Sequence, residues 1–286
     1  MNTPKLTVVI PTCRRNDLLA RCLDCLVPGA QTLPAEQYEV IVSDDGPADN
    51  NARQLVETRY PAVRWFQGPR RGPAANRNHG ASHANAPWLA FTDDDCVPQP
   101  GWLEVFARRI AEPDGDGCRV LEGRTDCGVE HIGPFEQAPG NDTGGFLWSC
   151  NFAVERALFE RMGGFDAGFP YPHLEDVDFR LRLDDAGEPY RFLPEARIVH
   201  PPRPVGPALS WVRAQESSFY LARKRGVSLA AVNFSVGTYL RLCKRSFEGA
   251  RGAWEATRLG WRIVEEVALL GFYLPRFVRK YRRDAA

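Results

Sequence analysis

The sequence has no net charge, no long apolar run near its start, and no internal repeat or low-complexity tract. Lysine and arginine together number 36, as do aspartate and glutamate, so no global field recruits nucleic acid and any electrostatic site has to be local. The apolar run at residues 6–10 is too short for the core of a secretory signal. We therefore expect a neutral cytoplasmic protein without a nucleic-acid partner.

Closely spaced cysteine pairs are also scarce. Among eight cysteines, Cys22 and Cys25 lie one helical turn apart beside leucines, and no second such pair follows. A zinc site or a disulfide framework normally shows repeated spacing of this kind. Free thiols that pack in the core are the expected state.

Strand-like and helix-like segments alternate along the first half of the chain. Strands are expected at residues 6–10, 38–43, 63–67 and 88–92, and helical segments at 17–26, 48–60 and 74–85. This alternation predicts an α/β fold with a mainly parallel, twisted sheet flanked by helices. Residues 112–145 are rich in Gly, Pro and Asp and are expected to form a loop-heavy connection with one strand at 119–125.

Polar residues follow three of the expected strands, at Pro11–Thr12, Asp44–Gly46 and Asp93–Asp95. Ligands of open parallel sheets bind at the carboxyl ends of the strands. Three consecutive carboxylates repel one another, so they need a cation or water. On extended backbone, Asp93 and Asp95 point to the same side, which suits Mg²⁺ or Mn²⁺ completed by a substrate diphosphate. A solvated acidic turn before the next helix is the alternative.

Five short motifs occur in order between residues 6 and 202. They are Val8–Thr12, Val42–Gly46, Gly72–Asn78, Asp93–Asp95, and Gly163–Asp166 followed by Glu175–Asp176. Together they resemble the family-2 glycosyltransferases, which have the GT-A fold and invert the transferred sugar. The resemblance implies a catalytic domain over residues 1–206. Residues 1–110 would form its nucleotide-binding half and residues 111–206 its acceptor-binding half.

The resemblance implies that Pro11, Thr12 and Asp45 line the base and ribose pocket, with Asp45 accepting a hydrogen bond from a pyrimidine ring N–H. Such an acceptor makes UDP the first choice, followed by dTDP and GDP. The Tyr-Asn pair that usually follows the first strand in this family is missing. Arg14 or Arg15, which lie near that position, could instead stack on the base or pair with a phosphate.

The remaining donor-side residues also follow from the resemblance. Arg77 would reach the nucleotide or its diphosphate, Asp93 and Asp94 the bound nucleotide sugar, and Asp93 and Asp95 the metal. His200, which ends another expected strand, would be a further metal ligand, since a neutral imidazole can bind Mn²⁺ beside carboxylates. A histidine packed before two prolines is the alternative.

Inverting transfer requires a base that takes the proton from the acceptor hydroxyl. Glu175 and Asp176 begin a segment with helical spacing, and the resemblance makes Asp176 the base and Glu175 a residue that contacts the acceptor or orients the site. Acidic residues also complement the dipole of a first helical turn without any catalytic role. On the acceptor side we expect Trp148 to stack on a sugar, Asn151 to bind its hydroxyls and Gly164 to belong to the acceptor loop. Packing of Trp148 in the core is the alternative.

Residues 207–286 are expected to form a C-terminal helical extension, with helices near 208–225 and 253–283. Its last helix combines aromatic residues with a basic end, which suits a helix lying on an anionic membrane, at the inner face of the plasma membrane. The uncharged stretch 267–275 is too short to span a bilayer. Packing against the catalytic domain or a second subunit is the alternative. The basic residues near this end are Arg276, Arg279, Lys280, Arg282 and Arg283.

The resemblance thus implies a hexosyltransferase-type, metal-dependent enzyme that moves a sugar from a nucleotide-diphosphate sugar to a glycan or lipid-linked acceptor in cell-envelope polysaccharide synthesis. A nucleotidyltransferase would share the core and the metal, but residues 11–17 contain no glycine for its phosphate loop. A non-catalytic protein that binds a nucleotide sugar or a membrane partner is the other alternative.

Overall fold

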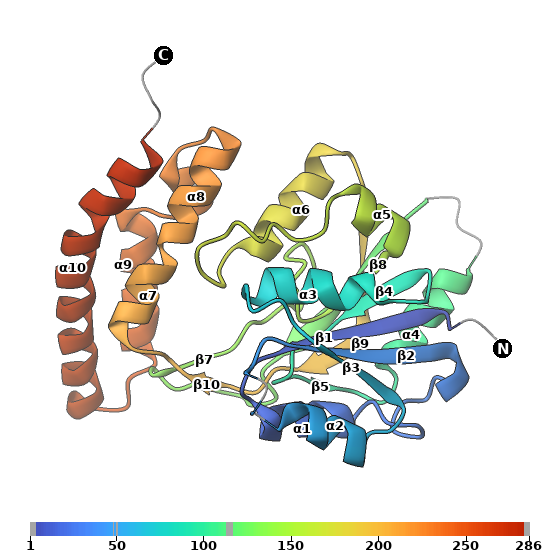
Figure 1. Ribbon diagram of the computed structural model, residues 1–286. Coiled ribbons are helices and arrows are strands. Elements are labelled where there is room, and N and C mark those ends of the chain that lie inside the picture. Colours follow the sequence, from blue (N-terminus) through green and yellow to red (C-terminus); the bar gives the residue numbers. More distant parts are fainter. Residues whose placement is uncertain (1–3, 48, 50, 113–116, 283–286) are drawn as a thin grey trace. The chain divides into compact units, whose positions relative to one another are not determined.

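The computed structural model describes residues 4–47, 49, 51–112 and 117–282, so Arg283 lies outside the described residues. The chain divides into two compact units (Figure 1). The first unit comprises residues 1–128, 139–167 and 175–201. The second comprises residues 129–138, 168–174 and 202–286.

The first unit is built on one sheet with the strand order β3-β2-β1-β4-β8-β6-β9-β5. Its strands are β1 (Leu6–Thr12), β2 (Tyr38–Asp44), β3 (Val63–Gln67), β4 (Trp88–Phe91), β5 (Val97–Pro98), β6 (Val120–Asp126), β8 (Phe152–Glu155) and β9 (Tyr190–Val199). The run from β3 to β4 is parallel throughout, β6 pairs with β9 in parallel, and β8 and β5 pair antiparallel with their neighbours. The predicted α/β fold with a mainly parallel sheet is confirmed, as is each expected strand.

Helices cover both faces of this sheet. They are α1 (Asn16–Asp24), α2 (Ala52–Arg59), α3 (Pro73–Ser82), α4 (Trp102–Ala111), α5 (Arg156–Arg161) and α6 (Glu175–Asp185), with a short 3-10 turn η1 (Ala35–Gln37) before β2. Side chains of a strand alternate between its faces. Leu6, Val8 and Ile10 of β1 accordingly pack with α1, α2 and α4, whereas Val9 packs with α3, α5 and α6.

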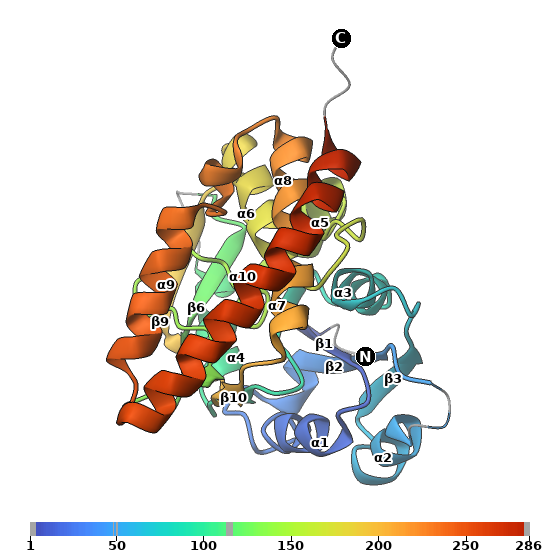
Figure 2. The ribbon, with the colours of Figure 1, turned by 90° about the vertical axis from the view of Figure 1, so that its left-hand side faces the viewer.

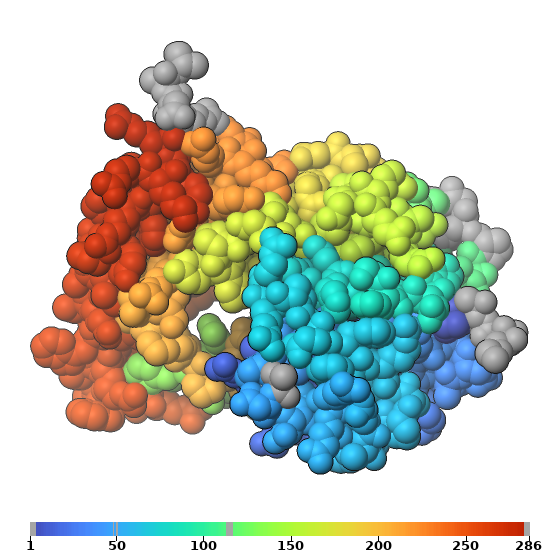
Figure 3. Space-filling view, in the orientation of Figure 1, coloured from blue at the N-terminus to red at the C-terminus, as the bar shows by residue number. Residues whose placement is uncertain are grey.

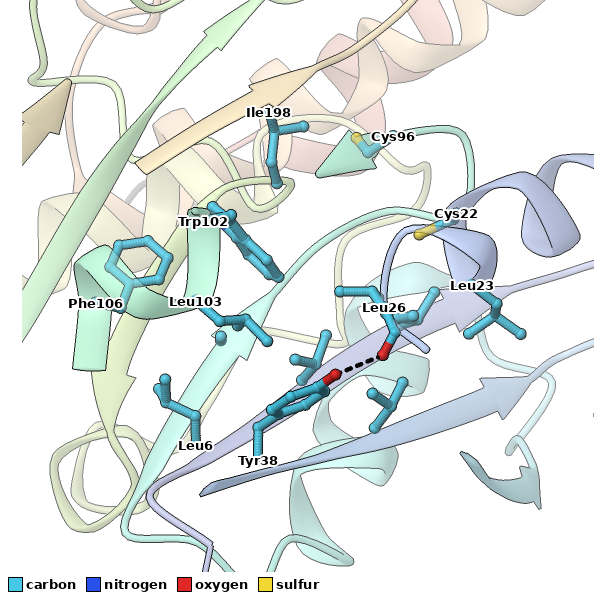
Figure 4. Close-up of a cluster of buried hydrophobic side chains, with 14 of the residues drawn as sticks. Leu6, Cys22, Leu23, Leu26, Tyr38, Cys96, Trp102, Leu103, Phe106 and Ile198 are labelled. Carbon is cyan, nitrogen blue, oxygen red and sulfur yellow. Dashed lines mark hydrogen bonds between the residues drawn. The ribbon is translucent and has the colours of Figure 1, made fainter. Parts of the chain in front are cut away.

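The larger of the two clusters has a polar anchor at Tyr38 (Figure 4). The Tyr38 hydroxyl donates to the backbone oxygen of Leu26 over 2.9 Å, which satisfies a phenol inside the apolar layer. Trp102 and Phe106 of α4 meet edge to face beside it, with ring centroids 5.7 Å apart. The expectation of free thiols is confirmed for all eight cysteines, of which three, Cys22, Cys96 and Cys150, are buried.

The second unit contains a two-stranded sheet and a group of helices. Its elements are β7 (Glu136–Gln137), β10 (Arg203–Pro204), α7 (Ala208–Ala214), α8 (Glu216–Arg225), η2 (Leu229–Val232), α9 (Val236–Glu248) and α10 (Ala253–Tyr281). The two helical regions expected here are present, and α9 was not anticipated from the sequence. This helix begins with Val236-Gly237-Thr238, which are poor helix formers. The Ser235 side chain accepts a hydrogen bond from the Thr238 amide and so caps the start of the helix. Within the described residues, no helix is long and apolar enough to cross a membrane.

Candidate active site

The carboxyl ends of three neighbouring parallel strands lie together because β1 pairs with both β2 and β4. The Thr12 hydroxyl at the end of β1 donates to Asp94 Oδ2 over 2.6 Å, although the two residues are 82 positions apart. Pro11 and Thr12 are both buried at this end of the strand. The edge of the sheet where polar residues were expected to gather is therefore a single site.

The loop after β2 is tied to the start of α3 by Asp45. Its two carboxylate oxygens accept hydrogen bonds from the backbone amides of Arg70 and Gly72, each over 2.9 Å. A Cβ added at Gly68 would lie 2.3 Å from Asp45 Oδ1, so only glycine lets the chain pass this close. These bonds hold the Asp45 carboxylate in a fixed orientation.

Asn76 on α3 is buried and connects several elements. It belongs to the motif Gly72–Asn78, but the sequence analysis assigned no role to it. Its amide nitrogen donates to the backbone oxygens of Thr12 and Ser43, over 3.2 and 2.8 Å, and its carbonyl oxygen accepts from the Ser43 hydroxyl over 2.6 Å. The side chain therefore joins β1, β2 and α3 behind the pocket. A buried amide beginning a helix next to two strand ends is the signal that could have identified it.

The three consecutive aspartates turn to different partners. Asp93 accepts from Arg77 Nη2 over 2.6 Å, whereas Asp94 and Asp95 both pair with Arg15, over 2.5 and 2.9 Å. The predicted need of these carboxylates for a cation is met in part by arginines. Arg15 was considered only as a base or phosphate contact, and its pairing with the acidic run was missed. Arg14 beside it is exposed, with a positive φ of 57°.

The electrostatic environment separates the carboxylates of this run. Burial and the neighbouring carboxylates raise the pKa of Asp94 to about 7 in spite of Arg15 and Thr12. Burial acts in the same direction on Asp93, but the charge and hydrogen bond of Arg77, with the charge of Arg15, hold its pKa below the ordinary value. Because its pKa is lowered whereas that of Asp94 is raised, Asp93 stays ionised more readily than Asp94 does.

One cluster of possible metal ligands occurs in the part of the chain that the structure describes. It consists of Asp95, Cys96 and His200, whose ligand atoms lie within 4.8 Å of one another, and Asp93 is not part of it. Burial raises the pKa of the Cys96 thiol well above its ordinary value, and sulfur is a soft ligand that Mg²⁺ and Mn²⁺ do not favour. Asp95 and His200 are the members that suit a hard divalent cation.

The hydrogen bonding of the His200 ring fits this assignment. Nδ1 lies 3.1 Å from the backbone oxygen of Pro201, which can only accept, so Nδ1 carries the proton. In the neutral ring, Nε2 then presents a lone pair toward Asp95 Oδ1 at 3.3 Å. Two lone pairs facing each other in a buried position are what a cation between them would stabilise.

Arg77 joins this acidic run to the start of α6. Its side chain is almost fully buried and donates from Nη2 to Asp93 and from Nη1 to Glu175 Oε1, the latter over 3.2 Å. The guanidinium also lies over the ring of Phe165, 5.6 Å from its centroid. Although burial disfavours the charge, the two carboxylates raise the pKa of Arg77, which remains a cation.

Asp176 follows Glu175 in the first turn of α6 and is partly exposed. Its carboxylate accepts from the backbone amide of Val177 over 2.8 Å, and the backbone of Ser149 supplies a second hydrogen bond. Burial raises the pKa of Asp176, with these amides and Arg77 opposing the shift. The geometry therefore places a carboxylate of increased basicity beside the Arg77 bridge.

The three expected acceptor residues have different surroundings. Trp148 is half-buried, donates from Nε1 to Gly140 O over 3.1 Å and stacks on Phe146, whose ring is 43% exposed, at a centroid distance of 5.3 Å. Asn151 is buried, and all its polar atoms are used within the fold, by Trp102 and by the backbone of Arg124 and Ala196. Asn151 therefore has a structural task, and its expected contact with sugar hydroxyls stays a prediction.

Gly164 belongs to a turn that Asn78 holds in place. Asn78 bonds the backbone oxygen and amide of Phe165, over 2.7 and 2.9 Å, and a Cβ on Gly164 would lie 2.6 Å from Asn78 Oδ1. Arg182 of α6 donates to the Gly164 backbone oxygen over 2.6 Å. The turn thus fixes the position of α6 relative to α3.

This site and this fold can be compared with known proteins. Residues 7–162 match the family model "Glycosyl transferase family 2", and the chain belongs to this family. It is 29% identical over 218 residues to glycosyltransferase AglE of Haloferax volcanii, a match that covers 72% of this chain and 70% of that protein. It is 30% identical over 229 residues to validoxylamine A glucosyltransferase of Streptomyces hygroscopicus subsp. limoneus, which covers 66% of this chain but 49% of the relative.

The fold agrees with a solved glycosyltransferase. Mannosyltransferase PcManGT from Pyrobaculum calidifontis, in complex with GDP-Man and Mn²⁺, matches the whole chain and 89% of its own length, with a TM-score of 0.55 and 18% identity. The protein therefore has the GT-A fold, and as a family-2 member it is a glycosyltransferase. The resemblance inferred from five short motifs is confirmed, and glycosyl transfer takes the place of the nucleotidyltransferase alternative.

Proposed function

We propose that this glycosyltransferase is inverting and metal-dependent, and that it transfers a sugar from a nucleotide-diphosphate sugar to a hydroxyl of a glycan or lipid-linked acceptor. The observation that carries the proposal is the Arg77 bridge between Asp93 and Glu175. It joins the acidic run, where a donor diphosphate would bind, to the helix start that holds Asp176. Inversion needs the departing diphosphate on one face of the anomeric carbon and the acceptor hydroxyl, with its general base, on the opposite face.

Asp95 and His200 would hold the divalent cation, Mn²⁺ or Mg²⁺, together with oxygens of the diphosphate. When bound, the cation would neutralise charge on the departing diphosphate. Asp93 would accept hydrogen bonds from ribose or sugar hydroxyls, since it stays ionised and is partly accessible. The facing lone pairs of His200 Nε2 and Asp95 Oδ1 support this cation site. The Mn²⁺ in the PcManGT complex is consistent with it.

For the nucleobase of the donor we propose a pyrimidine, with UDP as the first choice of nucleotide. Asp45 is held by the Arg70 and Gly72 amides so that its carboxylate keeps one orientation beside the end of β1. Each oxygen has a further lone pair with which it could accept a ring N–H. Guanine also offers a ring N–H, and the neighbouring PcManGT structure contains GDP-Man, so GDP and dTDP sugars belong in any donor screen.

Asp176 would act as the general base. Its raised pKa increases its affinity for the acceptor proton, and its partial exposure leaves room for a hydroxyl. Glu175 is bonded to Arg77 and would orient the site. The Phe146–Trp148 pair offers an aromatic surface on which a sugar ring could stack. Assembly of an envelope polysaccharide is the process we infer for such an acceptor.

The proposal is tested by screening UDP-, dTDP- and GDP-sugars for hydrolysis with and without Mn²⁺, which reports the donor without knowledge of the acceptor. Asp176→Asn should lower turnover by about 10²–10⁴-fold. Asp184→Asn is the matched control, because Asp184 lies exposed on the same helix and forms an ion pair with half-buried Arg180 one turn away. Full turnover in both Asp176→Asn and Asp95→Asn would show that the assigned roles are wrong. Nucleotide binding without turnover over a broad acceptor panel would favour a non-catalytic protein.

A further inference from the structure

The zero net charge of the chain conceals a strong asymmetry. Residues 202–286 contain 16 lysines and arginines but 6 aspartates and glutamates, a net charge of +10, and the first 201 residues carry the compensating −10. Most of the second unit is made from this basic segment. A local field of this size attracts anionic surfaces, although the whole chain is neutral.

The same unit contains most of the large exposed hydrophobic side chains. Two of them are tryptophans of α10, Trp254 at 74% and Trp261 at 72% exposure, and Phe272 on the same helix is 58% exposed. Val236 and Leu240 of α9 are 76% and 60% exposed. Single exposed apolar residues are ordinary, but several on adjacent helices of one unit form a surface that calls for a partner.

These residues of α10 lie on one side of the helix. The exposed positions 254, 257, 261, 264, 268, 272 and 275 are three or four apart, the spacing of a single helical face. They are occupied by Trp, Thr, Trp, Val, Ala, Phe and Pro, with no charge among them. These seven positions form the outer face of α10. Arg258, Arg276 and Arg279 border or end it and are exposed, and one exposed carboxylate, Glu265, also borders it.

The opposite side of α10 is already packed within its own unit. Leu259 and Phe277 are buried, and the Phe277 ring lies 5.5 Å from that of Phe219 on α8. Buried Glu266 accepts from Tyr239 of α9 over 2.9 Å and pairs with Arg262 over 2.8 Å. Helices α10 and α9 lie side by side in this unit (Figure 2). The outer face is therefore not needed to complete the fold of this unit.

The exposure of α10 extends along the helix. Figure 3 shows part of its surface, in red, exposed along one side of the second unit. At about 1.5 Å per residue, its 29 residues extend for about 43 Å, enough to contact many headgroups at once. No described helix can cross a bilayer, so a lipid contact here would be parallel to the surface.

We propose that the outer face of α10, with the exposed apolar residues of α9, docks onto an anionic lipid bilayer. Tryptophan prefers the boundary between headgroups and acyl chains, and arginines beside it would contact lipid phosphates. A second copy of this chain is a poorer occupant, because two copies of the basic segment 202–286, each with a net charge of +10, repel each other unless another face compensates. This inference does not depend on the donor, metal or base assigned above.

Flotation of the full chain with vesicles tests the proposal. We expect the protein to float with vesicles of phosphatidylcholine containing about one-third phosphatidylglycerol, and to remain at the bottom with phosphatidylcholine alone. Raising the salt from about 0.1 to 0.5 M should weaken the binding, since it screens the arginine contacts. The Trp254→Ser/Trp261→Ser double variant should bind at least about tenfold more weakly.

Matched variants separate the apolar contribution from the charge. Val227→Ser, in the same unit and at an exposed hydrophobic position outside α9 and α10, should bind as the unchanged protein does. The Arg276→Glu/Arg279→Glu variant should weaken binding to anionic vesicles while both tryptophans stay in place. It keeps the proposal testable if the tryptophan variant does not fold. Equal binding by all variants, or no binding to anionic vesicles, would overturn the proposal. So would a dimer in solution that the tryptophan variant turns into a monomer while vesicles stay unbound.

Discussion

Arg77 and Glu175 lie 98 positions apart in the sequence, yet Arg77 Nη1 donates to Glu175 Oε1 over 3.2 Å in a buried setting. The bond joins α3, which begins beside the Asp45 loop, to α6, which carries Asp176. Because Arg77 also holds Asp93, one guanidinium sets the distance between the expected donor region and the expected base.

Replacing Arg77 by methionine should destabilise the first unit, because two largely buried carboxylates lose their countercharge. We expect a loss of about 3–5 kcal/mol in the free energy of unfolding, measured by urea denaturation at pH 7.5. Arg77→Lys should recover part of this loss, since an ammonium can pair with one carboxylate but lacks the planar fork. A methionine variant as stable as the unchanged protein would show that the bridge contributes nothing net.

Removing His200 should weaken metal binding. Since its Nε2 faces Asp95 Oδ1 at 3.3 Å, His200→Ala should raise the Mn²⁺ concentration needed for half-maximal donor hydrolysis by at least about tenfold. His131→Ala is the control, because that imidazole is exposed in the second unit. Calorimetric titration with Mn²⁺ and nucleotide gives a readout apart from turnover, and unchanged affinity there would remove His200 from the site.

The two glycines before Phe165 provide a matched pair. Both have positive φ, 75° at Gly163 and 65° at Gly164, so alanine strains either backbone by about 1 kcal/mol. Only at Gly164 would the new Cβ also collide, 2.6 Å from Asn78 Oδ1. Gly164→Ala should therefore cost about 1–3 kcal/mol more than Gly163→Ala in thermal unfolding. Equal losses of stability in the two variants would show that Asn78 and its turn move to accommodate the new Cβ at no cost in stability.

Glu39 predicts an acid-sensitive contribution to stability. Burial by itself raises its pKa, but hydrogen bonds from Thr7, Asn85 and Arg64 outweigh this and lower it below the ordinary 4.5. A carboxyl whose pKa is lower in the folded state stabilises the protein above its unfolded pKa, and the contribution disappears as pH falls through the folded value. Glu39→Gln should cost about 1–3 kcal/mol at pH 7 and progressively less below pH 4.5.

The matched comparison for this titration is Glu36→Gln, because Glu36 is exposed in η1 close by in the sequence. Its variant should follow the unchanged protein over the whole range in chemical denaturation between about pH 3 and 7. A Glu39→Gln variant that stays less stable by the same amount at low pH would contradict the assignment.

Much of the fold was predictable because its signals are local. The apolar runs of β1, β2, β3 and β4 are bounded by polar residues, and each appears within two residues of its expected position. The meeting of Thr12, Asp45 and Asp94 follows from parallel pairing, which places all carboxyl ends at one edge. Helix α9 escaped prediction because its start has low helix propensity and its stability comes from packing against α10.

The choice of partners within the site was not predictable in the same way. Nothing in the pattern around Arg15 distinguishes a carboxylate from a phosphate as its partner, and the outcome depends on how the turn after β1 meets Asp94 and Asp95. Asn151 is another case, since a polar residue beside a tryptophan suits a sugar site and a buried connector equally well. Only the geometry of Trp102 and two backbone carbonyls reveals the role of connector.

Glu122 on β6 has a consequence for how the molecule assembles. Its carboxylate is buried and accepts from the backbone amides of Gly145, Phe146 and Leu147 and from the Asn141 side chain, so it substitutes for a partner strand. The 141–147 segment can become ordered only after β6 has paired with β8 and β9, which requires contacts between distant parts of the chain. We therefore expect the segment leading to Trp148 to acquire amide protection late in refolding, and a nascent chain to remain inactive until its sheet has closed.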